Sequence, residues 1–162
     1  MQRITPCLWF DDQAEQAVAF YTAIFKNSRI ANIARYGEAG HEVHGKTAET
    51  VMAVAFELDG QAFSALNGGP AFKFNEAISL QVNCETQQEV DYYWEKLSEH
   101  GDEKVQQCGW LKDQYGVSWQ IVPLVLLQML TGPDHEKSQR AMQAMLQMKK
   151  IDIDKLKRAF AG

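Results

Sequence analysis

The chain contains two copies of one pattern, and this internal repeat constrains the fold more than any other feature. Residues 8–21 align with residues 80–93, which lie 72 positions further along, and the two segments share leucine, glutamine, valine and tyrosine at matching places. In each copy an alternating apolar run gives way to a polar turn and then to helical spacing, over residues 14–25 and 86–99. Each copy therefore starts with a strand followed by a helix.

A second match extends the repeat. Residues 54–67 parallel residues 110–123 at a spacing of 56, with a glycine at the same place in each turn, and further strands are predicted over residues 28–36 and 103–107. Each half then follows the order β-α-β-β-β. One helix covers only one face of its sheet, so the other face is left for a ligand, a partner or the other half. The predicted fold class is α+β, with paired βαβββ modules forming a curved mixed sheet with a cleft, plus C-terminal helices.

This repeat divides the chain into four predicted parts. They are a first module over residues 1–67, a linker over 68–75, a second module over 76–123 and a helical tail over 124–162. In the tail, Asp134 and Asp152 are predicted N-caps of two helices. Methionines recur there at helical spacing, at positions 142, 145 and 148. A methionine stripe is more typical of a packing surface than of a cofactor site, so the tail is expected to dock on the body or on another subunit.

The composition of the 162-residue chain excludes several classes of function. A formal charge of −5 argues against nucleic acid as a partner, because phosphate binding depends on clustered Lys and Arg. The N-terminus lacks the basic and apolar regions of a signal peptide, and the longest apolar run, residues 122–130, is much shorter than the roughly 20 residues that cross a bilayer. Three cysteines, Cys7, Cys84 and Cys108, cannot all pair within one chain. A cytoplasmic location without a membrane or nucleic-acid partner is predicted.

Four segments resemble a known family: LWFDDQAEQAVAFYTAIF, NGGPAFKFNEAISLQVNC, CGWLKDQYGVSWQIVP and AMLQMKKIDIDKLKRAF. They are similar to the vicinal oxygen chelate superfamily, which includes glyoxalase I, extradiol dioxygenases and bleomycin-resistance proteins. Within it they resemble the PhnB-like group, long labelled 3-demethylubiquinone-9 3-methyltransferase. The resemblance implies paired βαβββ modules, usually in a homodimer. The methyltransferase label is not expected to apply, because the only glycine-rich stretch, NGGP, precedes an extended segment rather than a helix.

The same resemblance implies where a metal would bind. Metal-dependent members of the superfamily use four ligands, drawn from His, Glu and Gln, on the first and fourth strands of each module. Those positions correspond here to Thr5, Ser64, Ala77 and Gln120. Only Gln120 is a conventional ligand, and one amide oxygen does not hold a transition metal against water. No metal and no cofactor are therefore predicted.

Strand alternation directs small and amide-bearing side chains to one face, which suits a wet pocket for an uncharged polar ligand. The predicted ligand-binding residues are Thr5, Cys7, Trp9, Ser64, Asn67, Ser79, Gln81, Ser118 and Gln120. Two interpretations of Gln120 and its neighbours remain: the amides bind a ligand, or they satisfy one another across the sheet, as buried polar groups normally do.

The predicted function is the binding of a small organic molecule in a metal-free cleft by a homodimer, with no reaction specified. One alternative is a metal-dependent lyase, isomerase or dioxygenase of the vicinal oxygen chelate type. Another is a sequestering resistance protein. The loop that carries His41 and His44 admits three interpretations: solvated side chains, a metal site, or a lid that supplies a general acid or base.

Overall fold

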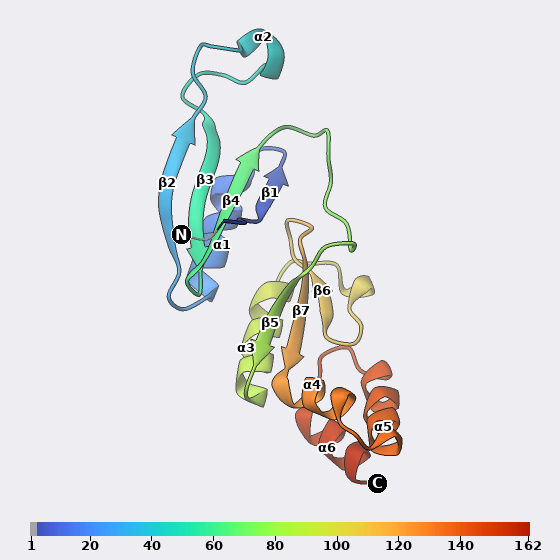
Figure 1. Cartoon of the computed structure of the whole chain (residues 1–162). Coiled ribbons are helices and arrows are strands. Elements are labelled where there is room, and N and C mark those ends of the chain that lie inside the picture. The colour runs from blue at the N-terminus through green and yellow to red at the C-terminus, as the bar shows by residue number, and fades with distance from the viewer. Residues whose placement is uncertain (1–2) are drawn as a thin grey trace. The chain divides into compact units, whose positions relative to one another are not determined.

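The computed structural model describes residues 3–162, which form two compact units, Met1–Phe74 (unit 1) and Asn75–Gly162 (unit 2). Unit 1 is drawn from blue to green in Figure 1 and unit 2 from green to red. Each unit contains a mixed sheet and its own helices. The predicted α+β fold class is confirmed, and the predicted helices over residues 14–25 and 86–99 are present with slightly shorter bounds.

Unit 1 is one βαβββ module with a short additional helix. Its elements are β1 (Cys7–Phe10), α1 (Ala14–Ile24), β2 (Arg29–Arg35), α2 (His41–His44), β3 (Val51–Leu58) and β4 (Gln61–Asn67). The strand order is β1-β4-β3-β2, with β1 parallel to β4 and the other pairs antiparallel. Helix α1 buries Ala14, Ala17, Val18, Tyr21 and Ile24, the spacing of an amphipathic helix whose apolar stripe packs on a core.

Unit 2 repeats the pattern with one strand fewer. Its elements are β5 (Leu80–Cys84), α3 (Gln87–Ser98), η1 (Glu103–Val105), β6 (Trp110–Lys112), β7 (Ser118–Pro123), α4 (Leu124–Thr131), α5 (His135–Leu146) and α6 (Ile153–Ala161). The described part of its sheet has three strands in the order β5-β7-β6. The strand predicted over residues 103–107 is wrong, because Asp102 accepts a hydrogen bond from the Lys104 backbone N–H at 2.9 Å and starts a 3₁₀ turn there.

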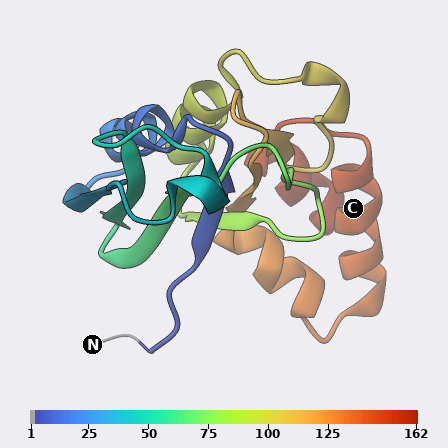
Figure 2. The same ribbon diagram turned by 90° about the horizontal axis from the view of Figure 1, so that it is seen from above.

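The C-terminal helices α4, α5 and α6 pack together, and both views of the ribbon show them side by side (Figures 1 and 2). Their shared core consists of Leu126, Met129, Ala141, Ile151 and Leu156, with Met145, Met148 and Phe160 packed against it. The two predicted N-caps are confirmed, since Asp134 accepts from Lys137 N and Asp152 accepts from Lys155 N.

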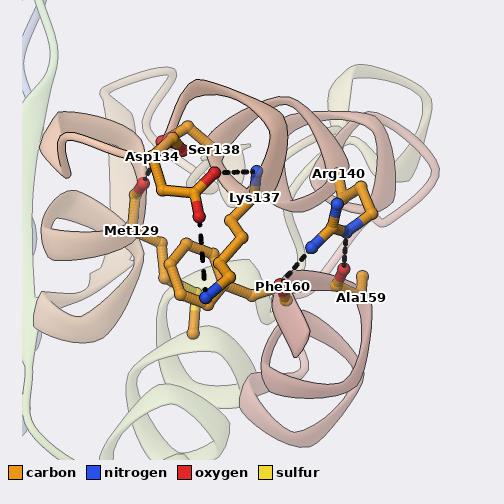
Figure 3. Close-up of polar contacts among 7 residues, drawn as sticks. All are labelled: Met129, Asp134, Lys137, Ser138, Arg140, Ala159 and Phe160. Carbon is orange, nitrogen blue, oxygen red and sulfur yellow. Dashed lines mark hydrogen bonds and ion pairs between the residues drawn. The ribbon is translucent and has the colours of Figure 1, made fainter. Parts of the chain in front are cut away.

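Hydrogen bonds connect α5 to α4 and to α6 (Figure 3). The Ser138 hydroxyl, buried between α4 and α5, donates to Met129 O at 2.7 Å. The Arg140 guanidinium donates to Ala159 O at 3.0 Å and to Phe160 O at 2.9 Å. Arg140 thus satisfies carbonyl groups that the last turn of α6 leaves without intrahelical partners.

The segment between α5 and α6 hydrogen-bonds to the body of unit 2. Cys108 N and Gly109 N each donate at 2.8 Å, to Met148 O and Lys149 O. Gly109 has a φ of +83°, and a Cβ built there would lie 2.8 Å from Ile121 O, so glycine is required at this crossing. The tail is therefore an integral part of unit 2, which agrees with the first of the two predicted docking partners, the body of the chain.

Within residues 3–162, every helix is too short or too polar to cross a bilayer.

Acidification should loosen the tail, because the carboxylates that hold it have lowered pKa values. Backbone hydrogen bonds from Lys137 and Lys155 lower the pKa of Asp134 and Asp152, and Lys150 lowers that of Asp91 on α3. A folded-state pKa below the unfolded value gives stability that is present above about pH 4 and is lost as pH falls through the folded value. Chemical unfolding midpoints should change little from about pH 7 to about pH 5 and then fall.

The matched control for this prediction is the double variant Asp134→Asn/Asp152→Asn. Asparagine keeps the N-cap but does not titrate, so the decrease in stability below about pH 4 should be shallower in the variant. An equal decrease in wild type and variant would contradict the assignment of the acid response to these caps.

Candidate functional site

The candidate site is the face of the β5-β7-β6 sheet that α3 does not cover. Gln120 lies beside Gln81 on one side and Trp110 on the other. Residues on the opposite face, including Val82, Trp119 and Ile121, are buried. The strand pairing therefore brings Gln81 and Gln120 together on one exposed sheet face, as the alternation of the sequence predicted.

The amides on this face are partly satisfied within the sheet. Gln120 Nε2 donates to Ser79 Oγ at 2.8 Å, and Gln81 Nε2 donates to Asn83 Oδ1 at 2.7 Å. Gln81 and Asn83 are exposed and Gln120 is half-buried. Gln120 Oε1 accepts no hydrogen bond from the described residues. Gln120 thus combines the two predicted interpretations: one half of its amide pairs with Ser79, and the other half remains available as an acceptor.

Ser118 is the polar residue most deeply enclosed beside this face. Its side chain is buried, with 2% of the residue exposed, and its hydroxyl has no hydrogen-bond partner among residues 3–162. Ser118 lies beside Lys112 in the sheet, and Lys112 forms an ion pair with Glu76. The Lys112 ammonium lowers the pKa of the Glu76 carboxyl. A buried hydroxyl without a partner is costly, so Ser118 has hydrogen-bonding capacity to offer.

In unit 1, Cys7, Trp9 and Ser64 share the sheet face opposite α1. Cys7 pairs with Ser64 in the parallel register of β1 and β4. The Trp9 indole N–H donates to Gly69 O at 2.8 Å, and its ring meets Phe72 edge-to-face at 5.0 Å. Trp9 is therefore held in place by the segment that follows β4.

The two remaining positions that the family resemblance implies lie outside the strands. Thr5 precedes β1, Ala77 precedes β5, and both are exposed. The residues that lie directly across from Ser64 and Gln120 are instead Cys7 and Gln81. None of these residues adds an imidazole or a carboxylate donor.

Asn67 lies on the other face, among the core residues of unit 1. Its Oδ1 accepts from the Ala14 backbone N–H at 2.8 Å, and its Nδ2 donates to Val51 O at 3.0 Å. Its backbone carbonyl accepts from the Tyr36 hydroxyl at 2.7 Å. Asn67 thereby caps α1, because Gln13, at the N-cap position of this helix, makes no side-chain cap. Its side chain does not join Cys7 and Ser64.

Sequence reasoning missed Asp113, which organises the turn between β6 and β7. This carboxylate is buried and accepts from Tyr115 N at 2.9 Å and Val117 N at 3.0 Å, and from the Trp119 indole N–H at 2.8 Å. Burial, followed by the charge of Asp113, raises the pKa of Tyr115. The signal was present in the sequence, because an aspartate three residues before a glycine is typical of a tight turn.

In the described part of the chain, histidine and cysteine side chains do not form a reactive cluster. His44 Nδ1 accepts from Lys46 N at 2.9 Å, and its ring stacks on Tyr36 with centroids 4.5 Å apart. Burial raises the pKa of the Cys84 thiol to about 12, whereas Cys7 is exposed. Within the described residues, no three His, Cys, Asp or Glu side chains approach one another closely enough to hold a metal ion.

Comparison with known proteins identifies the family. A family model described as 3-demethylubiquinone-9 3-methyltransferase matches residues 2–122. The chain belongs to this PhnB-like family. A PhnB protein from Bacillus cereus, described as a putative 3-demethylubiquinone-9 3-methyltransferase, shares 38% identity, with a TM-score of 0.65 over 75% of this chain and 99% of that one. A search of curated proteins found no match.

More distant structures share the fold of this PhnB-like chain. A protein from Pseudomonas aeruginosa is 18% identical, with a TM-score of 0.58 over 76% of this chain and 98% of that one. The fosfomycin resistance protein FosX from Listeria monocytogenes is 14% identical, with a TM-score of 0.55 over 81% and 98%. The family match ends at Val122, within β7 and two residues before α4 begins. The predicted family resemblance of the tail segment AMLQMKKIDIDKLKRAF therefore falls outside it.

Proposed function

We propose that this PhnB-like protein binds a small, uncharged polar organic molecule on the amide-bearing face of the β5-β7-β6 sheet. The observation that carries the proposal is the grouping of Gln81 and Gln120 beside the buried, unpartnered hydroxyl of Ser118. Amides and hydroxyls both donate and accept hydrogen bonds without net charge, so they suit carbonyl, amide or hydroxyl groups of a neutral ligand.

The surroundings of these groups favour a neutral ligand over an ion. Lys112, the cation beside Ser118, is already paired with Glu76. Trp110 lies beside Gln120 and is half-buried, so it can contribute an apolar surface next to the amides. A charged ligand would have to compete with the existing ion pair, whereas a neutral one would not.

The proposal includes metal-free binding, a homodimer and a cytoplasmic location. Metal-free binding is supported by donor chemistry, because Ser64, Gln120, Cys7 and Gln81 provide two amides, a hydroxyl and one thiol across the two strand pairs. Elemental analysis of the purified protein tests this part directly. One tightly bound divalent ion per subunit would contradict it and favour the metal-dependent lyase, isomerase or dioxygenase instead.

The variant Gln120→Leu should abolish ligand binding while leaving stability nearly unchanged. The substitution removes the hydrogen bond from Gln120 to Ser79, but Ser79 is half-buried and its hydroxyl can bond to water instead. The free energy of unfolding should therefore fall by no more than about 1 kcal/mol. Thermal-shift screening against a library of neutral polar metabolites supplies the ligand, and calorimetric titration compares the variant with wild type.

Gln114→Leu is the matched control, because Gln114 is an exposed glutamine in the turn between β6 and β7. It should bind every ligand of the wild type with unchanged affinity. Intact ligand binding in Gln120→Leu, or a loss of stability above about 2 kcal/mol, would identify Gln120 as a structural amide.

A further inference from the structure

Unit 1 contains a cavity that the proposed function does not use. It has a volume of about 440 Å³, within the range of small-molecule sites. It lies between the start of α1, the end of β2 and the loop that follows α2, and all of its lining residues belong to unit 1. Its lining therefore shares no residue with the amide-bearing face of unit 2.

The charges around this cavity are divided between two walls. Asp12 and Glu15, at the start of α1, supply carboxylates, whereas Arg35, at the end of β2, and Lys46, in the loop after α2, supply cations. Among the ion pairs of residues 3–162, none involves any of these four side chains. Opposite charges therefore line one cavity without neutralising each other.

Hydrogen bonds fix the backbone around the cavity, and none of those named here joins a cationic side chain to an anionic one. Asn67 joins the start of α1 to Val51, and the Thr50 hydroxyl donates to Thr47 O at 2.7 Å. Lys46 N donates to the His44 ring. Preorganised walls reduce the cost of ordering a site when a ligand binds.

Among residues 3–162, the side chains of the two cations hydrogen-bond only to backbone carbonyls. Arg35 Nη1 donates to Glu49 O at 2.9 Å, and Lys46 Nζ approaches Asp11 O at 3.4 Å. Arg35 has five N–H donors in total, so it retains the capacity to bind a carboxylate. We propose that this cavity binds a small zwitterion, whose carboxylate meets Arg35 and Lys46 and whose ammonium group meets Asp12 and Glu15.

Calorimetric titration of the full chain tests the proposal with three linear zwitterions of increasing charge separation: glycine, β-alanine and glycylglycine. At least one should bind with a dissociation constant of about 1 mM at low salt, a modest value because Asp12, Glu15 and Arg35 are exposed. Two analogues of glycylglycine each remove one charge: N-acetylglycylglycine lacks the ammonium and glycylglycinamide lacks the carboxylate. Each should bind at least about tenfold more weakly than a zwitterion that binds.

Matched variants locate the site. Arg35→Gln and Glu15→Gln should each weaken zwitterion binding by about tenfold or more. Arg29→Gln changes an arginine of the same strand that pairs with Glu57 outside the cavity, and it should leave binding unchanged. Gln120→Leu should also leave it unchanged, so the outcome is independent of the proposed function.

Three results would overturn the zwitterion site. They are the absence of binding by all three zwitterions up to about 20 mM, binding of the two single-charge analogues that is as tight as that of the zwitterions, and binding that survives both Arg35→Gln and Glu15→Gln.

Discussion

Asp113→Ala should destabilise unit 2 by about 4 kcal/mol. The substitution leaves the backbone N–H groups of Tyr115 and Val117 and the indole N–H of Trp119 without their acceptor, and Trp119 and Val117 are buried. Each stranded buried donor costs about 1–3 kcal/mol, and partial hydration reduces the sum. Urea unfolding followed by tryptophan fluorescence measures the loss.

Two variants serve as controls for Asp113→Ala. Asp113→Asn keeps an acceptor oxygen for the two backbone donors and should cost less than alanine. Gln114→Ala, at the exposed neighbouring position, should lie within about 0.5 kcal/mol of wild type. If Asp113→Ala unfolds at the wild-type urea concentration, the carboxylate does not organise the β6–β7 turn.

Leu156→Ala should destabilise unit 2 by about 3 kcal/mol, because Leu156 is 0% exposed in the core of the three C-terminal helices. Removing a buried leucine side chain costs its transfer free energy plus that of the cavity it leaves. Leu146→Ala is the matched control, since Leu146 ends α5 and is 49% exposed. It should change the free energy of unfolding by less than about 1 kcal/mol.

Deleting residues 132–162 extends the same experiment. The deletion exposes Leu126 and Met129 and removes the two carbonyl acceptors of Cys108 N and Gly109 N. The shortened chain should lose cooperative unfolding of unit 2 or aggregate. Unchanged stability in both Leu156→Ala and the deletion would mean that the tail does not support unit 2.

Strand alternation made much of the candidate face predictable, even though the repeat was aligned out of register. The sequence alignment places Leu8 over Leu80. In the structure, Leu8 pairs with Ala65 and Val82 pairs with Ile121. Ala65 and Ile121 are equivalent at the repeat spacing of 56, so Leu8 corresponds to Val82. A shift of two residues preserves the side-chain face, because the period of a strand is two. Gln81 and Gln120 were therefore assigned to the correct face, while their direct pairing was not foreseen.

Local hydrogen bonds account for what the sequence did not predict. Residues 103–107 are only five positions long, too few for alternation to outweigh the Asp102 cap that turns the chain. Asn67 is among the predicted ligand-binding residues, and the structure shows in addition that its amide caps α1 across 53 residues of sequence. Contacts of this kind depend on the tertiary arrangement, which residue patterns along the chain do not encode directly.

The proposed neutral ligand should occupy the amide-bearing face of the β5-β7-β6 sheet. Two-dimensional NMR of the side-chain amides tests this binding mode, with the protein titrated by a hit from the neutral-metabolite screen. The side-chain amide resonances of Gln81 and Gln120 should shift in a saturable manner, while that of Gln114 stays fixed. Saturable binding that shifts other resonances and leaves those of both Gln81 and Gln120 unchanged would contradict ligand binding on this face.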